Sequence, residues 1–161
     1  MAGHGGQLLG VGTQAPGFQL ESLDNGAIGL ADMLAQGPVL LAFSKISCPV
    51  CQLTFPFLQR LHEAGAVSVY GISQDDAEGA REFIEAFGVG FPVLLDSEDD
   101  GFPVSSAFGI GSVPTLYLIE RDGSIAGVTE GWQKRAMLEL AARNHLMLFR
   151  EGEHVPEWRP G

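Results

Sequence analysis

Residues 38–56 read Pro-Val-Leu-Leu-Ala-Phe-Ser-Lys-Ile-Ser-Cys-Pro-Val-Cys-Gln-Leu-Thr-Phe-Pro, and this stretch decides the fold. Its first part, residues 38–43, is a continuous apolar run typical of a strand buried on both faces. The Cys-Pro-Val-Cys motif at residues 48–51 follows, and its proline suits the first helical position, where a backbone N–H is not needed. The stretch therefore predicts a buried strand, a short loop and a helix over 49–64 that begins directly after Cys48.

The motif at residues 48–51 contains the only two cysteines of the chain. A cysteine at a helix N-terminus lies near unpaired N–H groups and the positive end of the helix dipole, and both favour a thiolate. A thiolate beside a second thiol can carry out thiol–disulfide exchange. A strand, a Cys-x-x-Cys motif and a helix in this order are the context that indicates redox chemistry.

Two structural interpretations of the same cysteines fit less well. A zinc site would need a second Cys-x-x-Cys motif or a histidine pair, and the four histidines lie apart, at positions 4, 62, 145 and 154. A purely structural disulfide within the motif would close too short a loop to stabilise the fold much. Redox chemistry is therefore the favoured interpretation.

The composition describes one globular domain. The chain has 161 residues, of which 45% are hydrophobic and 18% charged, so it can build a core without disulfide staples. Nine basic and twenty acidic residues give a formal net charge of −11. Because lysine and arginine form no cluster, this balance argues against nucleic acid and anionic membrane surfaces as partners.

The sequence also bears on targeting. No apolar run approaches the roughly 20 residues that a membrane-spanning helix needs. Residues 1–6, Met-Ala-Gly-His-Gly-Gly, have neither a basic start nor an apolar segment, so they do not form a signal peptide. As the sequence stands we expect a cytoplasmic protein, and a periplasmic one if a native export signal is missing from it.

Hydrophobic periodicity and turn signals predict an alternation of strands and helices. The expected strands cover residues 17–20, 27–30, 38–43, 67–72, 91–95, 115–119 and 124–129, and the expected helices cover residues 31–36, 49–64, 75–87, 104–108 and 133–148. This order gives a mixed sheet with helices on both faces. We expect a flexible leader over 1–10, a single domain over 11–149 and an irregular tail over 150–161.

Two further segments, together with the Cys-x-x-Cys motif at residues 48–51, resemble a known family. Residues 11–18, Val-Gly-Thr-Gln-Ala-Pro-Gly-Phe, are similar to the Gly-x-x-Ala-Pro-x-Phe entry of peroxiredoxins and TlpA-like proteins. Residues 111–115, Gly-Ser-Val-Pro-Thr, are similar to the cis-proline loop that faces the Cys-x-x-Cys motif in thioredoxin-like proteins. The chain thus resembles the redoxin and TlpA-like branch of the thioredoxin fold, related to AhpC/TSA proteins. The Asp-Asn-Gly turn at residues 24–26 predicts an N-terminal β-hairpin, and the resemblance implies a strand–helix unit inserted before the proline loop.

The resemblance also implies roles for individual residues. Cys48 is expected to attack a disulfide and Cys51 to resolve the mixed disulfide. The residues expected to contact substrate are Pro49, Val50, Val113 and Pro114. The Val113–Pro114 bond is expected to be cis. Lys45 and Thr54 are possible modulators of the two thiols, and no metal or organic cofactor is implied.

Two departures from the family concern acid–base chemistry. The buried acid of thioredoxins corresponds to Ala42, and the glutamate of TlpA-like proteins corresponds to Thr54. The sequence therefore shows no obvious general base for Cys51, which leaves water or Thr54 for that step. Lys45 could lower the pKa of Cys48 if its ammonium group points inward.

Two alternative functions remain open. In a thiol-dependent peroxidase, Cys48 would react with peroxide, but the proline, threonine and arginine that peroxiredoxins use correspond to Leu41, Lys45 and a position near Val113. A metal chaperone would hold Cu(I) or Zn(II) with both thiolates and a third ligand, and His62 lies about three helical turns beyond the motif. The favoured function is a monomeric thiol–disulfide oxidoreductase that acts on protein or small-molecule disulfides together with a redox partner.

Overall fold

A five-stranded mixed sheet forms the centre of the molecule, with strand order β5-β4-β3-β6-β7. The computed structural model describes residues 7–161. The strands are β3 (Val39–Ser44), β4 (Ser68–Ser73), β5 (Val93–Leu95), β6 (Thr115–Ile119) and β7 (Ile125–Glu130). The central strand β3 runs parallel to β4 and antiparallel to β6, and all six of its residues are buried. The expectation of a strand buried on both faces is confirmed.

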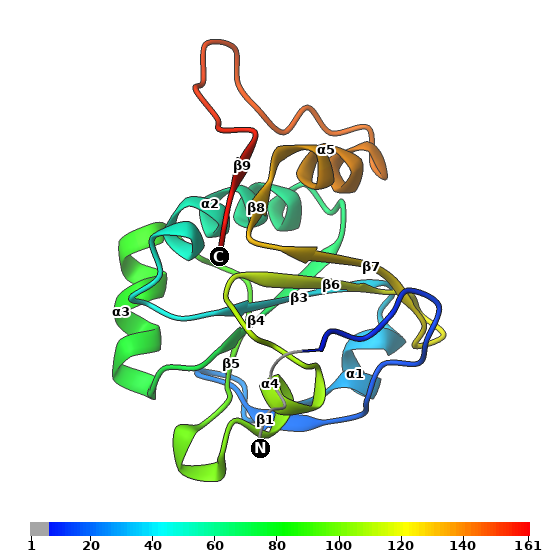
Figure 1. The fold of residues 1–161 in the computed structure, drawn as a ribbon, viewed down its shortest axis with the longest axis vertical. Coiled ribbons are helices and arrows are strands. Elements are labelled where there is room, and N and C mark those ends of the chain that lie inside the picture. The colour runs from blue at the N-terminus through cyan, green and yellow to red at the C-terminus, as the bar shows by residue number, and fades with distance from the viewer. Residues whose placement is uncertain (1–6) are drawn as a thin grey trace.

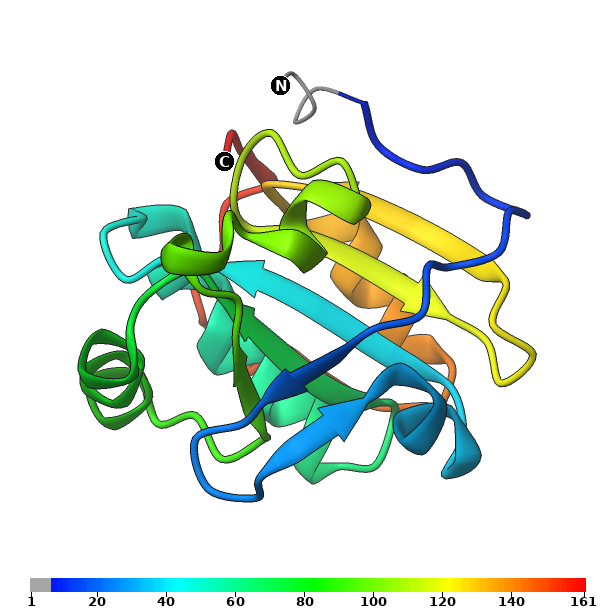
Figure 2. The same ribbon diagram turned by 90° about the horizontal axis from the view of Figure 1, so that it is seen from below.

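Helices cover both faces of this sheet (Figure 1). They are α1 (Leu30–Ala35), α2 (Pro49–Glu63), α3 (Ala77–Phe87), α4 (Pro103–Ala107) and α5 (Lys134–Ala142). A short 3-10 turn spans Glu98–Asp100. Figures 1 and 2 show α2 and α5 on one side of the sheet and α1 and α4 on the other.

The alternation of side chains along β3 divides the core into two clusters. Leu40 and Ala42 face a cluster built with α2, α3 and α5. Leu41 and Phe43 face the second cluster, built with α1 and α4. Helix α2, which begins at the Cys-x-x-Cys motif, therefore lies on the first face, where its buried residues hold it against the sheet.

The N-terminal part forms the expected hairpin. Strand β1 (Gln19–Glu21) pairs antiparallel with β2 (Ala27–Gly29). Gly26, in the turn between them, has a φ of 67°, a left-handed conformation that favours glycine. Together with the mixed sheet, the hairpin gives the thioredoxin-like architecture predicted from the sequence.

The last helix is shorter than predicted. The sequence pattern indicated a helix over 133–148, but α5 ends at Ala142. His145 takes a positive φ of 54°, and the N–H of Leu146 donates back to the Ala141 carbonyl at 3.0 Å. This backbone reversal satisfies a free carbonyl at the helix end. Leu148 is nevertheless buried in the core, so the apolar pattern extends beyond the end of the helix.

The tail over 150–161 was expected to be irregular, and this is wrong for part of it. Strand β9 (Trp158–Arg159) pairs antiparallel with β8 (Trp132–Gln133). The indole N–H of Trp132 donates to the Pro156 carbonyl at 2.6 Å. A partner strand far back in the sequence orders these residues, and local patterns do not reveal such a partner.

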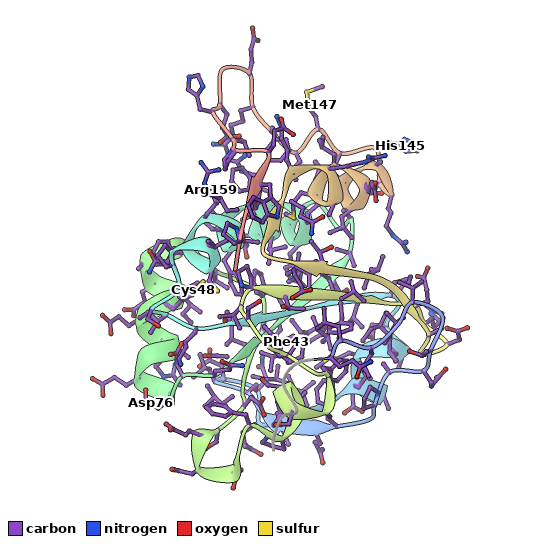
Figure 3. The ribbon with its side chains drawn as sticks, viewed as in Figure 1. Phe43, Cys48, Asp76, His145, Met147 and Arg159 are labelled. Atoms are coloured by element: carbon purple, nitrogen blue, oxygen red, sulfur yellow. The ribbon has the colours of Figure 1, made fainter. Side chains whose placement is uncertain are left out.

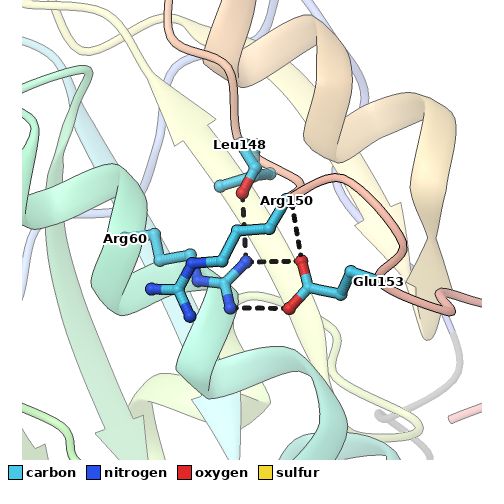
Figure 4. A network of polar contacts seen from close by, with 4 residues as sticks. All are labelled: Arg60, Leu148, Arg150 and Glu153. Carbon is cyan, nitrogen blue, oxygen red and sulfur yellow. Dashed lines mark hydrogen bonds and ion pairs between the residues drawn. The ribbon is translucent and has the colours of Figure 1, made fainter.

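An ion pair holds the first half of the tail (Figure 4). The Arg60 guanidinium of α2 donates through both terminal nitrogens to the two Glu153 carboxylate oxygens, each at 2.7 Å. Arg60 also donates to the Leu148 carbonyl at 3.1 Å, and the N–H of Arg150 donates to Glu153 at 3.0 Å. These contacts fix the segment that follows α5 to the far end of α2.

The predicted leader divides into two parts. Residues 1–6 lie outside the described residues. Leu8 and Leu9 pack against the second core cluster, and the N–H of Leu9 donates to the Tyr117 hydroxyl at 3.0 Å. The leader, domain and tail limits stay a prediction. No helix among the described residues is long and apolar enough to cross a membrane.

Candidate active site

The Cys-Pro-Val-Cys motif forms the first turn of α2, as predicted. Cys48 is the N-cap, with φ −92° and ψ 111°, and Pro49 occupies the first helical turn. The Cys51 N–H donates to the Cys48 sulfur at 3.2 Å. The N-terminal end of the helix therefore directs one of its free N–H groups at Cys48 Sγ, an arrangement that stabilises negative charge on sulfur.

The two thiols differ in burial. Cys48 is half-buried, whereas Cys51 has 0% of its surface exposed. Both are free thiols in this structure. Burial raises the pKa of the Cys51 thiol far above its usual range; a backbone hydrogen bond from Lys45 opposes the rise, while Cys48 and the charge of Asp75 add to it. Cys51 therefore exists as a thiol at neutral pH in the reduced protein.

The loop before β6 meets the motif in space. The Cys48 thiol donates to the Val113 carbonyl at 3.2 Å, across 65 positions of sequence. The Val113–Pro114 peptide bond is cis, as the resemblance implied. The Thr115 hydroxyl donates to the Ser112 carbonyl at 2.8 Å and closes the loop from the inside. The backbone of Val113 thus lies beside the Cys48 sulfur. Figure 3 labels Cys48 at the start of α2.

The remaining predicted site residues lie around this pair. Pro49 is exposed and Val50 half-buried on the first turn of α2. The Lys45 side chain is exposed, and no ion pair or side-chain hydrogen bond of Lys45 is found among residues 7–161. Thr54 is fully buried, and its hydroxyl donates to the Val50 carbonyl at 2.7 Å within the helix. The Thr54 hydroxyl proton is therefore already engaged.

Two observations bear on the alternative functions. Leu41 is buried in the second core cluster, so it supplies no hydrogen-bond donor to a peroxide. His62 accepts a hydrogen bond from the Val69 N–H through Nδ1 at 3.1 Å, and burial lowers its pKa. Among the described residues, no group of three histidine, cysteine or acidic side chains could hold a metal ion.

One residue near the site was not identified from the sequence. Asp75 follows β4, and its Oδ2 accepts the Ile46 N–H at 2.8 Å. Its charge raises the pKa of Cys51, after burial and the hydrogen bonds of that thiol. The parallel register that pairs Ser44 with Ser73 carries both strand ends to the same edge of the sheet. The sequence did predict apolar strands ending at residues 43 and 72. Because the carboxyl ends of parallel strands meet at the same edge of a sheet, the residues after residue 72 could have been expected near the motif.

The end of the tail borders the same loop. A Cβ added at Gly161 would lie 2.7 Å from the Val113 carbonyl oxygen, so this glycine sits directly against the backbone that Cys48 contacts. The N–H of Gly131 donates to the Pro114 carbonyl at 2.8 Å, and a side chain at Gly131 would collide with the Arg159 carbonyl. The tail therefore forms one border of the site.

Comparison with known proteins agrees with this geometry. The model of the AhpC/TSA family matches residues 11–128. The thiol-disulfide oxidoreductase ResA of Halalkalibacterium halodurans is 30% identical over 136 residues, which cover 82% of this chain and 75% of the relative. ResA of Bacillus subtilis is 27% identical over 153 residues, which cover 92% of this chain and 81% of that protein.

Solved structures support the fold. A thiol:disulfide interchange protein from Bacteroides sp. superposes with a TM-score of 0.74 at 23% identity, covering 91% of this chain and 96% of that one. The peroxidoxin BcpB of Mycobacterium tuberculosis gives a TM-score of 0.69 at 23% identity, covering 84% and 96%. Since proteins named for exchange and for peroxide chemistry share this architecture, the fold alone does not separate the two activities.

Proposed function

This chain belongs to the AhpC/TSA family, and from that premise we propose how its two cysteines work. The family match, the relatives named ResA and the thioredoxin-like fold identify a thiol–disulfide oxidoreductase. We assign the attack to Cys48 and the resolution to Cys51. The observation that carries this assignment is the contrast between a half-buried Cys48 at the helix N-cap and a fully buried Cys51 one turn inside.

The exchange runs in two displacements. The Cys48 thiolate attacks one sulfur of the substrate disulfide, forming a mixed disulfide, and the other substrate sulfur leaves as a thiolate that takes a proton from water. Cys51 then loses its proton and attacks the Cys48 sulfur. The Cys48–substrate bond breaks, and its electron pair leaves with the second substrate sulfur. The substrate gains two electrons, and the protein changes from dithiol to disulfide; the reverse sequence oxidises a dithiol.

Substrate contact is proposed along the exposed start of α2 and the proline loop. Pro49 and Val50 are proposed to offer the surface beside the Cys48 sulfur, with the half-buried Val113 opposite and the buried Pro114 shaping the loop behind it. An extended peptide could pair with the Val113 backbone in the way that added strands bind a sheet edge. Protein disulfides are the proposed substrates, and the protein is proposed to act on them as a monomer, which sedimentation would test.

Single cysteine variants test the assignment. Cys51→Ser should accumulate a mixed disulfide between Cys48 and a disulfide-containing peptide, visible by mass spectrometry under non-reducing conditions. Cys48→Ser should form none at a comparable rate. A mixed disulfide that forms through Cys51 would contradict the assignment. If the wild-type protein consumes hydrogen peroxide rapidly but exchanges with no peptide disulfide, the peroxidase alternative replaces the proposal.

A further inference from the structure

The tail returns to the site as a docked segment, residues 158–161. Its strand β9 pairs antiparallel with β8, and just before it the Lys134 N–H donates to the Glu157 carbonyl at 3.0 Å. The Trp132 indole N–H donates to the Pro156 carbonyl at 2.6 Å. Figures 1 and 2 both show the C end of this segment beside the loop that precedes β6. The docked segment is therefore anchored along β8 and ends at the proline loop.

Backbone lies against backbone where the docked segment ends. A Cβ added at Gly161 would lie 2.7 Å from the Val113 carbonyl oxygen and 3.3 Å from the Ser112 hydroxyl oxygen. On the neighbouring side, a Cβ added at Gly131 would lie 2.9 Å from the Gly161 nitrogen and would collide with the Arg159 carbonyl. Contacts this short leave no room for a side chain at either glycine, so the docked segment closely covers the loop.

The covered carbonyl belongs to the site. The Val113 carbonyl accepts the Cys48 thiol at 3.2 Å, and no hydrogen bond of the Val113 N–H is found within residues 7–161. A peptide strand that pairs with an edge residue uses both of these backbone groups. The docked segment therefore lies where such a strand would have to reach. Cys48 itself keeps part of its surface exposed.

Two classes of disulfide would meet the docked segment differently. A small disulfide such as glutathione disulfide needs only to approach the Cys48 sulfur. An extended peptide that pairs with Val113 must first move Gly161 away from the carbonyl, and so must loosen the strand pair that holds it. A net hydrogen bond changes an equilibrium about fivefold, so loosening one or two anchoring bonds should slow the peptide about tenfold.

We propose that residues 158–161 are a specificity-determining segment that covers the Val113 backbone, so that small disulfides react with Cys48 directly and extended peptides react only after they displace it. The proposal rests on the proposed function and adds a preference among its substrates. The docked segment acts on access to the loop and leaves the chemistry of both cysteines unchanged. Peptide disulfides remain substrates, at a rate that the docked segment limits.

The test compares the rates at which Cys48 of the reduced, full chain attacks glutathione disulfide and an extended peptide disulfide. Arg159 lies on β9 and is labelled in Figure 3. Arg159→Pro removes a backbone N–H from the strand pair and should detach β9. Arg159→Ala is the matched control, because it removes the same side chain and keeps the strand. Trp132→Phe is a second variant, which loosens the tail through the lost bond to Pro156 and leaves the docked segment's own sequence intact.

Arg159→Pro should react with the peptide disulfide about tenfold faster than wild type, and with glutathione disulfide at an unchanged rate. Arg159→Ala should match wild type for both disulfides. Trp132→Phe should show a smaller increase, for the peptide alone. Amide hydrogen exchange in β9, measured on the same samples by mass spectrometry, should be faster in Arg159→Pro and in Trp132→Phe.

Two results would overturn the proposal. One is a peptide rate that is unchanged or lower in Arg159→Pro although β9 exchanges faster, because the docked segment would then be neutral or part of the binding surface. The other is an equal rise for both disulfides, which would mean that the docked segment shields Cys48 itself. A wild-type protein whose Cys48 attacks neither disulfide would instead defeat the proposed function, so the two failures can be distinguished.

Discussion

Replacing Thr54 by glutamate should speed the resolving step. Thr54 stands where TlpA-like proteins carry a glutamate, it lies one turn after Cys51, and it is fully buried. Its hydroxyl donates to the Val50 carbonyl at 2.7 Å, and an alcohol oxygen is too weak a base to take the Cys51 proton at neutral pH. A carboxylate there would provide a base beside a thiol whose pKa burial has raised.

The size of the effect follows from the burial of this position. Desolvation should raise the pKa of the new carboxyl toward neutrality, where a general base is most effective. A well-placed base contributes roughly 10²–10⁴-fold, and we expect about tenfold for a carboxyl introduced without a supporting network. The larger side chain also overpacks a filled site, which should lower the free energy of unfolding by about 1–3 kcal/mol.

Stopped-flow mixing with a disulfide peptide separates the first attack from the resolution. Thr54→Glu should accelerate the second phase at neutral pH and change the first phase less, since Cys48 already has the helix N-terminus. Thr54→Gln is the matched control, because it has nearly the same shape and cannot take up a proton. The reasoning is refuted if the second phase is unchanged or slower in Thr54→Glu, or equally fast in Thr54→Gln.

Three further predictions concern the scaffold around the site. Phe55→Ala should lower the free energy of unfolding by about 3–5 kcal/mol in urea titrations, since this ring is buried in the first core cluster; a loss below 1 kcal/mol would show a loosely packed cluster. Trp132→Phe removes the hydrogen bond to the Pro156 carbonyl, so it should lower the free energy of unfolding by about 1 kcal/mol. It should also speed amide hydrogen exchange in the tail strand β9, and unchanged exchange there would contradict this prediction. The Arg60 side chain lowers the pKa of Glu153 from 4.5 to about 2. The ion pair therefore stabilises the fold above pH 4.5, and this contribution is lost as the pH falls from 4.5 toward 2. Glu153→Gln should have a lower free energy of unfolding than wild type at neutral pH, and the unfolding curves of the two proteins should converge in acid.

Local patterns were sufficient for the elements that build the site. The continuous apolar run of β3 indicates a strand that is covered on both faces, and the proline after Cys48 favours the first turn of a helix. Both requirements concern residues that are neighbours in sequence, so the strand, the loop and the helix start could be predicted together. The cis bond before Pro114 came from the resemblance to a family, because an X–Pro pair alone is cis only about one time in twenty.

Long-range pairings account for what the sequence did not reveal. Asp75 reaches the site because β3 and β4 run parallel in register, and nothing in its local sequence distinguishes it from Asp76. Strand β9 pairs with the strand that begins at Trp132. The Trp132 indole N–H also donates to the carbonyl of Pro156, 24 positions later in the sequence. The end of α5 depends on a backbone reversal at His145, which the apolar pattern does not reveal because that pattern continues to Leu148.

The central claim is that Cys48 attacks and Cys51 resolves. The most direct test is alkylation of the reduced wild-type protein by iodoacetamide at neutral pH, with the modified cysteine mapped by mass spectrometry over time. Because Cys48 is half-buried at the helix N-cap and Cys51 is fully buried with a raised pKa, Cys48 should be modified first and Cys51 only after unfolding. Modification of Cys51 before Cys48, or of both at equal rates in the folded protein, would contradict the account.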